Sequence, residues 1–300
     1  MFLQLFRNKI WENYKLRNKI RSINQAISNN YSRREPDIIA EIANVWNIYK
    51  IIRLTPFNIN NVVYNLWMEF EHKVTHGKLV TVEIKLNDGW LKNIKYETEF
   101  GDLALVVEYY LEKTLLSRRV SLLQTKKETR RDEAEITLHQ LFLMQYWPNI
   151  RLNNTFIKFN NTYPEDFSFY HFILAASKLK SCSSTVCSSM LVCEKIGADK
   201  SKLIKKLKNW RLQYKTSGLK PKPPTCKITG LSPGSIATLN ISRNNWSMVP
   251  KPFGKFLMDA AYLFVGTSNE EIWKLVWLVP NINVLILKVR ASREPPPEEE

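Results

Sequence analysis

Glycine is scarce in this chain, with nine residues among 300. Loops that bind nucleotide phosphates through backbone amides need closely spaced glycines, and neither Gly-x-Gly-x-x-Gly nor Gly-x-x-x-x-Gly-Lys occurs. The Gly-x-Ser-x-Gly motif of α/β-hydrolases is also missing. The sequence therefore does not support a P-loop nucleotidase, a dinucleotide-dependent enzyme or a serine hydrolase.

Cysteine and histidine are also few, with four residues of each type. The cysteines form no Cys-x-x-Cys pair and have no histidine at zinc-finger spacing, so they predict no zinc site: Cys182, Cys187, Cys193 and Cys226. His72 and His76 are four residues apart and could share a helix face, but no His-Glu-x-x-His frame surrounds them. We expect no metal and no cofactor in the main interpretation of this sequence.

Long apolar runs are absent. No stretch approaches the ~18 uninterrupted apolar residues that a transmembrane helix needs. The apolar start, Met1–Phe6, is too short for a secretory signal, and Arg7 and Lys9 follow it instead of preceding it. We therefore expect an intracellular protein, in the cytoplasm or nucleus and not secreted, whose thiols stay reduced.

Positive charge is abundant and unevenly placed. The chain has 44 Lys and Arg against 28 Asp and Glu, a net charge of +16. Residues 181–240 carry eleven cations and two anions, and residues 1–60 carry ten and four. Charge gathered into two segments is typical of a surface that binds a polyanion, whereas charge spread evenly only keeps a protein soluble.

Two basic amphipathic helices account for these segments. In the first, over 200–215, Leu203 and Leu207 make an apolar stripe and the candidate binding residues are Lys200, Lys202, Lys205, Lys206, Lys208, Trp210, Arg211 and Lys215. In the second, over 2–28, they are Arg7, Lys9, Lys15, Arg17, Lys19 and Arg21. The cations could neutralise phosphates of a nucleic acid or nucleoprotein, or the apolar stripe could lie in an anionic membrane surface. The third interpretation is an ordinary solvated helix surface.

The pattern along the chain predicts an α+β fold. We expect a basic helical N-terminal region over 1–76, a central mixed α+β domain over 77–216 and a Pro-rich linker over 217–224. A smaller C-terminal α+β unit over 225–293 and a disordered acidic tail over 294–300 complete the prediction. The expected helices are 2–28, 37–53, 58–74, 102–116, 134–146, 167–179, 200–215, 255–264 and 269–278. The expected strands are 80–86, a partner through Tyr96, 155–159, 226–229, 236–241 and 284–290, with 126–135 as loop or helix continuation and 181–189 as loop or short strand.

One pattern suggests chemistry. The alternating strand Val80–Leu86 contains Glu83 and Lys85, which are two residues apart and therefore share a face. In PD-(D/E)xK nucleases this spacing holds a metal-binding carboxylate and a charge-stabilising lysine, and Asp37 after Pro36 could supply the second ligand. The alternative function is therefore a Mg²⁺- or Mn²⁺-dependent nuclease using Asp37, Glu83 and Lys85. Glu83 and Lys85 are equally compatible with the solvated face of a strand.

The organisation resembles the matrix proteins of non-segmented negative-strand RNA viruses such as rhabdoviruses, and also viral accessory or movement proteins. The resemblance rests on the apolar-basic start Met1–Arg7, on the strand Thr81–Leu86 leading through Phe100–Ala104, and on Pro295-Pro296-Pro297-Glu298, which is similar to a late-budding motif. It implies a non-enzymatic protein of the virion or host cell that joins a nucleocapsid to an anionic membrane during assembly.

The leading hypothesis is thus a non-enzymatic, matrix-like binding or assembly protein that contacts nucleic acid, nucleoprotein or an anionic membrane. The alternative is the nuclease, and a third is a structural protein whose charge has no partner. The sequence leaves the oligomeric state open.

Overall fold

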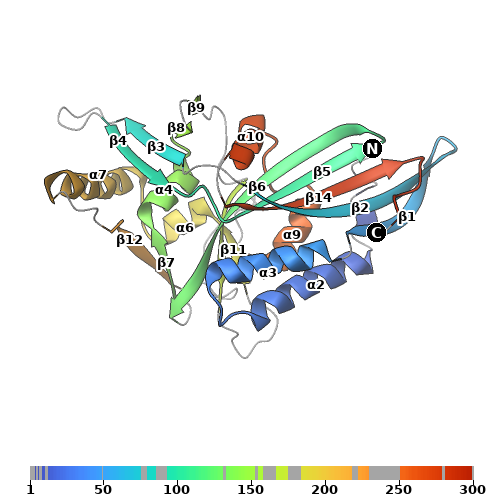
Figure 1. Cartoon of the computed structure of the whole chain (residues 1–300), viewed down its shortest axis with the longest axis horizontal. Coiled ribbons are helices and arrows are strands. Elements are labelled where there is room, and N and C mark those ends of the chain that lie inside the picture. The colour runs from blue at the N-terminus through green and yellow to red at the C-terminus, as the bar shows by residue number, and fades with distance from the viewer. Residues whose placement is uncertain are drawn as a thin grey trace.

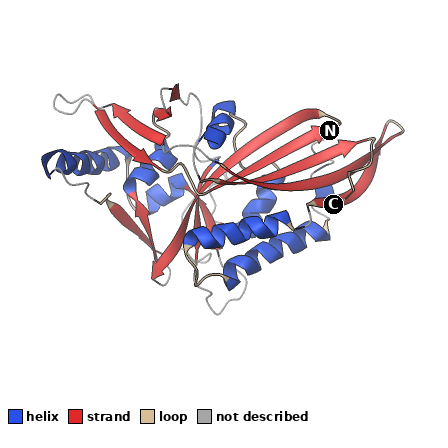
Figure 2. Cartoon of the chain, in the orientation of Figure 1, coloured by secondary structure: helices blue, strands red, loops and turns tan. Residues whose placement is uncertain are grey.

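The chain is a mixed α+β protein (Figures 1 and 2). A computed structural model describes residues 4, 6, 9–10, 13–48, 50–75, 80–85, 93–130, 133–152, 155–157, 167–174, 184–217, 222–229, 251–278 and 281–298. Its helices are α2 (Tyr14–Asn29), α3 (Glu35–Asn47), α4 (Leu138–Tyr146), α6 (Ser189–Lys195), α7 (Lys200–Ser217), α9 (Phe253–Ala261) and α10 (Glu270–Leu278). Its strands are β1 (Ile51–Ile59), β2 (Val62–Val74), β3 (Val80–Lys85), β4 (Asn93–Thr98), β5 (Leu103–Leu111), β6 (Thr114–Arg130), β7 (Glu133–Thr137), β8 (Ile150–Leu152), β9 (Thr155–Ile157), β10 (Ser168–Ile173), β11 (Ser184–Ser188), β12 (Thr225–Thr229), β13 (Lys251–Pro252) and β14 (Asn283–Ser292).

The main sheet has the strand order β1-β2-β14-β5-β6-β10-β11-β13. Strand β14, from the C-terminal part of the chain, lies between β2 and β5, antiparallel to the first and parallel to the second. Strand β5 is antiparallel to β6, and β6 is parallel to β10. The far end of β6 also pairs with β7, which pairs with β12. A second sheet has the order β4-β3-β8-β9.

Two hydrophobic cores lie on opposite faces of the main sheet. Leu122 and Leu123 illustrate the division, because neighbouring residues of a strand point to opposite faces. The α3-side core joins the sheet to α2, α3 and α9 and includes Leu16, Ile23, Ile38, Ile42, Leu105, Leu123 and Phe256. The α4-side core joins the other face to α4, α6, α7, α10 and the second sheet and includes Val82, Val106, Leu122, Leu141, Leu191, Leu207 and Leu275. Figure 1 shows α2 and α3 below the long strands and α7 beyond one end of them.

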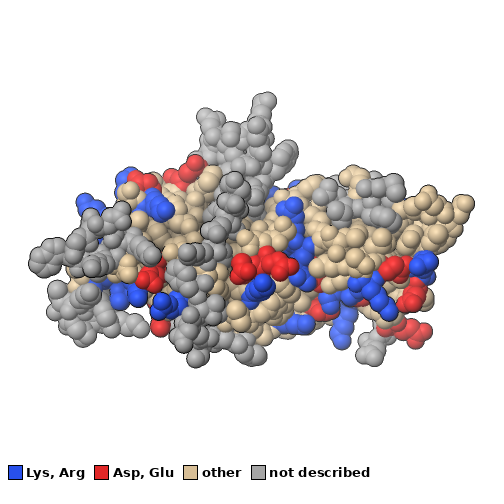
Figure 3. Space-filling model, turned by 90° about the horizontal axis from the view of Figure 1, so that it is seen from above, with Lys and Arg blue, Asp and Glu red and all other residues tan. Residues whose placement is uncertain are grey.

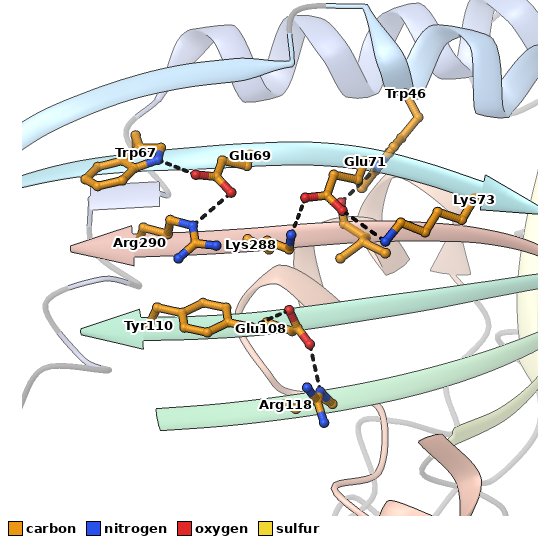
Figure 4. A network of polar contacts seen from close by, with 11 residues as sticks. Trp46, Trp67, Glu69, Glu71, Lys73, Glu108, Tyr110, Arg118, Lys288 and Arg290 are labelled. Carbon is orange, nitrogen blue, oxygen red and sulfur yellow. Dashed lines mark hydrogen bonds and ion pairs between the residues drawn. The ribbon is translucent and has the colours of Figure 1, made fainter. Parts of the chain in front are cut away.

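Charged side chains cross-link the strands around β14 (Figure 4). Arg290 of β14 pairs with Glu69 of β2 at 2.8 Å, and Lys288 of β14 pairs with Glu71 of the same strand. On β5 and β6, Glu108 pairs with Arg118 at 2.7 Å. Cross-strand pairs of opposite charge contribute roughly 0.2–1 kcal/mol each. They help to fix the register of β14 within the sheet.

Several predicted helices are strands. The prediction of a helix over 58–74 is wrong because β1 and β2 form a hairpin there, and the helix expected over 37–53 ends at Asn47. The helices expected over 102–116 and 167–179 are wrong for one physical reason: β5 is buried over Leu103–Tyr109 and all of β10 is buried. A strand buried on both faces shows no alternation, so its apolar run cannot be told from a helix.

Other predictions stand closer to the structure. The strands over 80–86, 226–229 and 284–290 and the helices over 200–215, 255–264 and 269–278 correspond to elements within a few residues. The segment 126–135 is not a loop or a helix, because it forms the end of β6 and the start of β7. The strand expected over 236–241 lies outside the described residues. The predicted C-terminal unit over 225–293 supplies β14 to the same sheet as the N-terminal strands.

Candidate functional site

Asp102, Gln124 and Lys126 meet where two antiparallel strands begin and end. Asp102 directly precedes β5, and Gln124 and Lys126 follow in β6 just after the last β5–β6 pair, Leu103 with Leu123. The backbone N–H of Asp102 donates to the carbonyl of Leu123 at 3.0 Å. Because Gln124 and Lys126 are two residues apart in a strand, they point to the same face as Leu122, the α4 side.

The Asp102 carboxylate is held by the neighbouring strand. Its Oδ2 atom accepts a hydrogen bond from the backbone N–H of Thr125 at 2.7 Å and another from the Gln124 side-chain amide. The opposite end of that amide, Gln124 Oε1, is buried and has no hydrogen-bond partner in the described part of the chain. Buried polar atoms in folded proteins almost always have a hydrogen-bond partner. This oxygen therefore calls for one, such as a water or a bound ion.

Glu35 reaches the same strand end from the other side of the sheet. It is the first residue of α3, which starts with Pro36 in its first turn. Its Oε2 accepts from the backbone N–H of Lys127 at 3.1 Å, and its Oε1 lies 3.9 Å from Lys126 Nζ. The Lys126 side chain is 17% exposed and that of Glu35 is 26% exposed. The Lys126 side chain therefore has a carboxylate partner and is partly exposed.

Burial and crowding raise the pKa values of the acids in this cluster. Burial raises the pKa of Asp102 to about 7, against the opposing effect of Lys126, and the negative charges of Glu35 and Glu99 add to the rise. The pKa of Glu35 is also raised, chiefly by burial, although Lys126 and the Lys127 amide act in the opposite direction. A cation that binds such a carboxyl near neutral pH displaces its proton to solvent.

Tyr170 and His139 are two further groups near the cluster with buried polar atoms that are unpaired among the described residues. Tyr170 of β10 pairs with Gln124 across the sheet, and its hydroxyl is buried without a described partner. His139 of α4 has the same property at Nδ1, and burial, followed by the charge of Lys126, lowers its pKa to about 4. The His139 ring lies 5.7 Å from that of Tyr96 and 5.7 Å from that of Trp210 on α7. The His139 ring thus packs against α7 through Trp210.

The donor atoms fit a small, hard cation. Asp102 offers a carboxylate and Gln124 an amide oxygen, and such oxygen donors suit Mg²⁺ or Mn²⁺ rather than zinc. Within the described ranges, no group of three or more His, Cys, Asp or Glu residues could hold a metal ion by itself. This donor set still suits Mg²⁺, which binds through one or two carboxylates and completes its shell with waters and substrate phosphate.

The nuclease residues predicted from the sequence do not form one site. Asp37 pairs with Arg34 on α3 at 3.2 Å. Glu83 accepts from Asn93 at 2.9 Å and pairs with Lys95 at 3.5 Å, both on β4. Helix α3 belongs to the α3-side core and β3 to the α4-side core, so the main sheet lies between Asp37 and Glu83. The Lys85 side chain lies outside the described residues.

The basic helix α7 buries its apolar stripe. Leu203 and Leu207 are fully buried in the α4-side core, and Trp210 is half-buried against it. Lys205 and Lys206 are exposed. Lys202 pairs with Asp199 at 3.3 Å, and Lys200 lies 5.5 Å from the centre of the Tyr146 ring. Lys208 and Arg211 are half-buried, and the side chain of Lys215 is not among those described.

The second basic segment is on the opposite side of the sheet. On α2, Lys15, Arg17 and Arg21 are exposed and Lys9 before it is half-buried, whereas Arg7 lies outside the described residues. Lys19 is buried, donates to the carbonyl of Ile48, and has a pKa lowered to about 8 by burial. Helices α2 and α7 contribute to different cores, so the two basic segments do not make one face. On the face seen in Figure 3, cations lie among acidic residues.

Histidine and cysteine contribute no further site in the described ranges. His72 Nε2 lies 2.9 Å from Asn283 Oδ1, and His76 is not described. Cys187, Cys193 and Cys226 are free thiols, buried or half-buried.

No described helix is both long and apolar enough to cross a membrane. Comparisons with protein-family models, curated proteins and solved structures found no match to this chain.

Proposed function

We propose that this chain is a metal-dependent nuclease, in which Asp102 and Gln124 hold Mg²⁺ or Mn²⁺ and Lys126 faces the scissile phosphodiester. Glu35 positions Lys126. The class of enzyme is the alternative that the sequence suggested, but the residues are different ones. The proposal retains a nucleic acid as the polyanionic partner and assigns it the role of substrate.

The observation that carries the proposal is the geometry of Asp102 with Gln124 and Lys126. A PD-(D/E)xK site has a carboxylate at the start of one strand and, on the antiparallel neighbour, a second acid followed two residues later by a lysine. Asp102 and Lys126 take the first and last of these places, and Gln124 stands where the second acid would be. The buried Gln124 Oε1 without a described partner supports a cation at this point. Spacing alone would be weak support, since Glu83 and Lys85 have it too.

The chemistry is hydrolysis of a phosphate diester. Water forms a new bond to phosphorus, one ester P–O bond breaks, and the proton released by water ends on the leaving sugar oxygen. Bound Mg²⁺ would polarise the phosphate and lower the pKa of water. The Lys126 ammonium stabilises the negative charge that builds on the phosphate oxygens, and Glu35, 3.9 Å away, restricts where that ammonium can lie.

The test is a cleavage assay with labelled single-stranded DNA, duplex DNA and RNA. Each is incubated with the full chain in Mg²⁺, in Mn²⁺ or in EDTA, and an Asp102→Asn protein purified identically measures contaminating activity. We expect cleavage of at least one substrate in Mg²⁺ or Mn²⁺, and none in EDTA. Cleavage that persists in EDTA, or no cleavage of any substrate in either metal, would overturn the proposal.

A further inference from the structure

Helix α7 has the composition of a polyanion-binding element. It contains seven Lys or Arg residues and no Asp or Glu between Lys200 and Ser217. Lys205 and Lys206 are exposed, and neither has an ion pair with an acid of the described chain. Each exposed cation that contacts a phosphate releases condensed counterions, so such a helix gains affinity for nucleic acid at low salt.

The packing of α7 argues against a membrane as the occupant of this surface. A helix that lies in a bilayer interface inserts its apolar face among the lipid acyl chains. On α7 that face is already used, because Leu203 and Leu207 are fully buried in the protein and Trp210 packs against His139 and Tyr96. The exposed residues of α7 include Lys205 and Lys206, and exposed cations of this kind are complementary to a phosphodiester backbone.

The position of α7 links it to the proposed active site. Trp210 lies 5.7 Å from the ring of His139, whose own pKa is lowered in part by the charge of Lys126. Lys205 and Lys206 line a cavity of about 280 Å³ that extends to Leu138, the residue before His139. Helix α7 and the side chains of Gln124 and Lys126 are on the same side of the main sheet, whereas α2 is on the other.

We infer that α7, through Lys205 and Lys206, binds the backbone of the nucleic-acid substrate next to the cleaved bond, and that the basic helix α2 does not. This inference rests on the proposed function, since it takes its substrate from there. It goes further by separating the two basic segments, which lie on opposite faces of the main sheet.

The experiment measures binding apart from cleavage. A fluorescently labelled 20-mer is titrated in EDTA with the Asp102→Asn chain, with and without Lys205→Gln and Lys206→Gln, from 50 to 200 mM KCl. The matched control carries Lys15→Gln and Arg21→Gln, which remove the same charge from exposed positions of α2. We expect the α7 variant to lower the salt slope by about two and the affinity on the order of tenfold, and the α2 variant to leave both unchanged.

Equal binding by the two variants, or a larger loss in the α2 variant, would overturn the inference while leaving the nuclease proposal intact. Failure of the nuclease proposal is read separately, from the cleavage assay in Mg²⁺ and Mn²⁺. Vesicles with and without phosphatidylserine provide a third arm. If the α7 substitutions reduce binding to anionic vesicles but not to the oligonucleotide, the surface binds membrane and the inference is wrong. Thermal melts check that both variants remain folded.

Discussion

The Gln124 side-chain amide donates to the Asp102 carboxylate, while its oxygen is buried without a hydrogen-bond partner among the described residues. An unsatisfied buried polar group costs roughly 1–3 kcal/mol of folding free energy. A water or a bound ion is what ordinarily satisfies such a group, and we assign this oxygen to a cation. Metal binding at this site therefore depends on Asp102 and Gln124 together.

Replacing Gln124 by Leu should weaken metal binding. The substitution puts an apolar side chain of similar size in place of the amide, and it removes both the oxygen and the N–H that donates to Asp102, so we expect Mn²⁺ affinity to fall about 10- to 100-fold. Isothermal titration with Mn²⁺ measures the affinity. The control is Thr125→Val, because the Thr125 side chain points to the opposite face, 3.5 Å from His171. Unchanged Mn²⁺ affinity in Gln124→Leu would exclude this oxygen as a ligand.

Lys126 and its neighbour Lys127 should differ in their effect on cleavage. Lys126 points into the site beside Glu35, whereas Lys127 Nζ donates to the carbonyl of Arg33 at 2.9 Å. We expect Lys126→Met to lower the single-turnover cleavage rate about 10²- to 10³-fold, because a charge that stabilises the transition state is lost. Lys127→Met, which removes the same charge one residue away, should stay within about threefold of the natural chain. Equal losses of cleavage rate in both variants would show that the loss comes from reduced positive charge near the site and not from a specific contact of Lys126 with the transition state.

Stability should fall as the pH rises through the titration of Asp102. Its pKa is about 7 in the folded chain against an ordinary value of 3.8, so the folded state binds the proton more tightly than the unfolded state. This group therefore destabilises the protein progressively between about pH 4 and 7. Asp102→Asn should melt higher than the natural chain at pH 8, with the difference shrinking towards pH 4. Differential scanning calorimetry across this range tests the prediction, and parallel melting curves would contradict it.

Metal should reverse that effect only in the natural chain. A cation that binds the folded state raises its melting temperature by mass action. Excess Mg²⁺ at pH 8 is therefore expected to stabilise the natural chain and to leave Asp102→Asn unchanged in the same calorimetric experiment.

Helices and strands could be assigned from the sequence where one face of the element is exposed to solvent. Lys200–Ser217 has cations around a narrow apolar stripe, so the helix could be predicted within two residues. Val80–Lys85 alternates, and it is a strand. Leu103–Leu111 and Ser168–Ile173 could not be assigned in this way, because they are central strands covered on both faces. The insertion of β14 between β2 and β5 is a long-range pairing that local sequence does not encode.

The site was missed as a consequence of those errors. A helix over 102–116 makes Asp102 its first residue, and Lys126 begins the segment 126–135 that is predicted as a loop or a helix continuation. The available signal was Gly101-Asp102 before one apolar run and Gln124-Thr125-Lys126 after another, Val120–Leu123. It becomes a site only when both runs are strands and are antiparallel, since this brings their opposite ends together.

Removing the C-terminal part of the chain should prevent folding. A chain ending at residue 224 lacks β14, which pairs with β2 from Asn283↔Val74 to Ser292↔Asn65 and with β5 along its other edge. We expect no cooperative thermal transition by far-ultraviolet circular dichroism. The control ends at residue 294, which keeps all of β14 and its contact with Asn65, and should melt as the full chain does. A sharp transition in the shorter chain would instead support the independent C-terminal unit predicted from the sequence.

The most direct test of the nuclease site compares two carboxylates, Asp102 and Glu83, in one single-turnover cleavage assay with Mg²⁺. The sequence favoured Glu83, which is paired with Asn93 and Lys95, and the geometry favours Asp102 beside Gln124. We predict that Asp102→Asn lowers the cleavage rate at least about 100-fold, and that Glu83→Gln keeps the rate within about threefold of the natural chain. Full activity in Asp102→Asn, or an equal loss in Glu83→Gln, would contradict it.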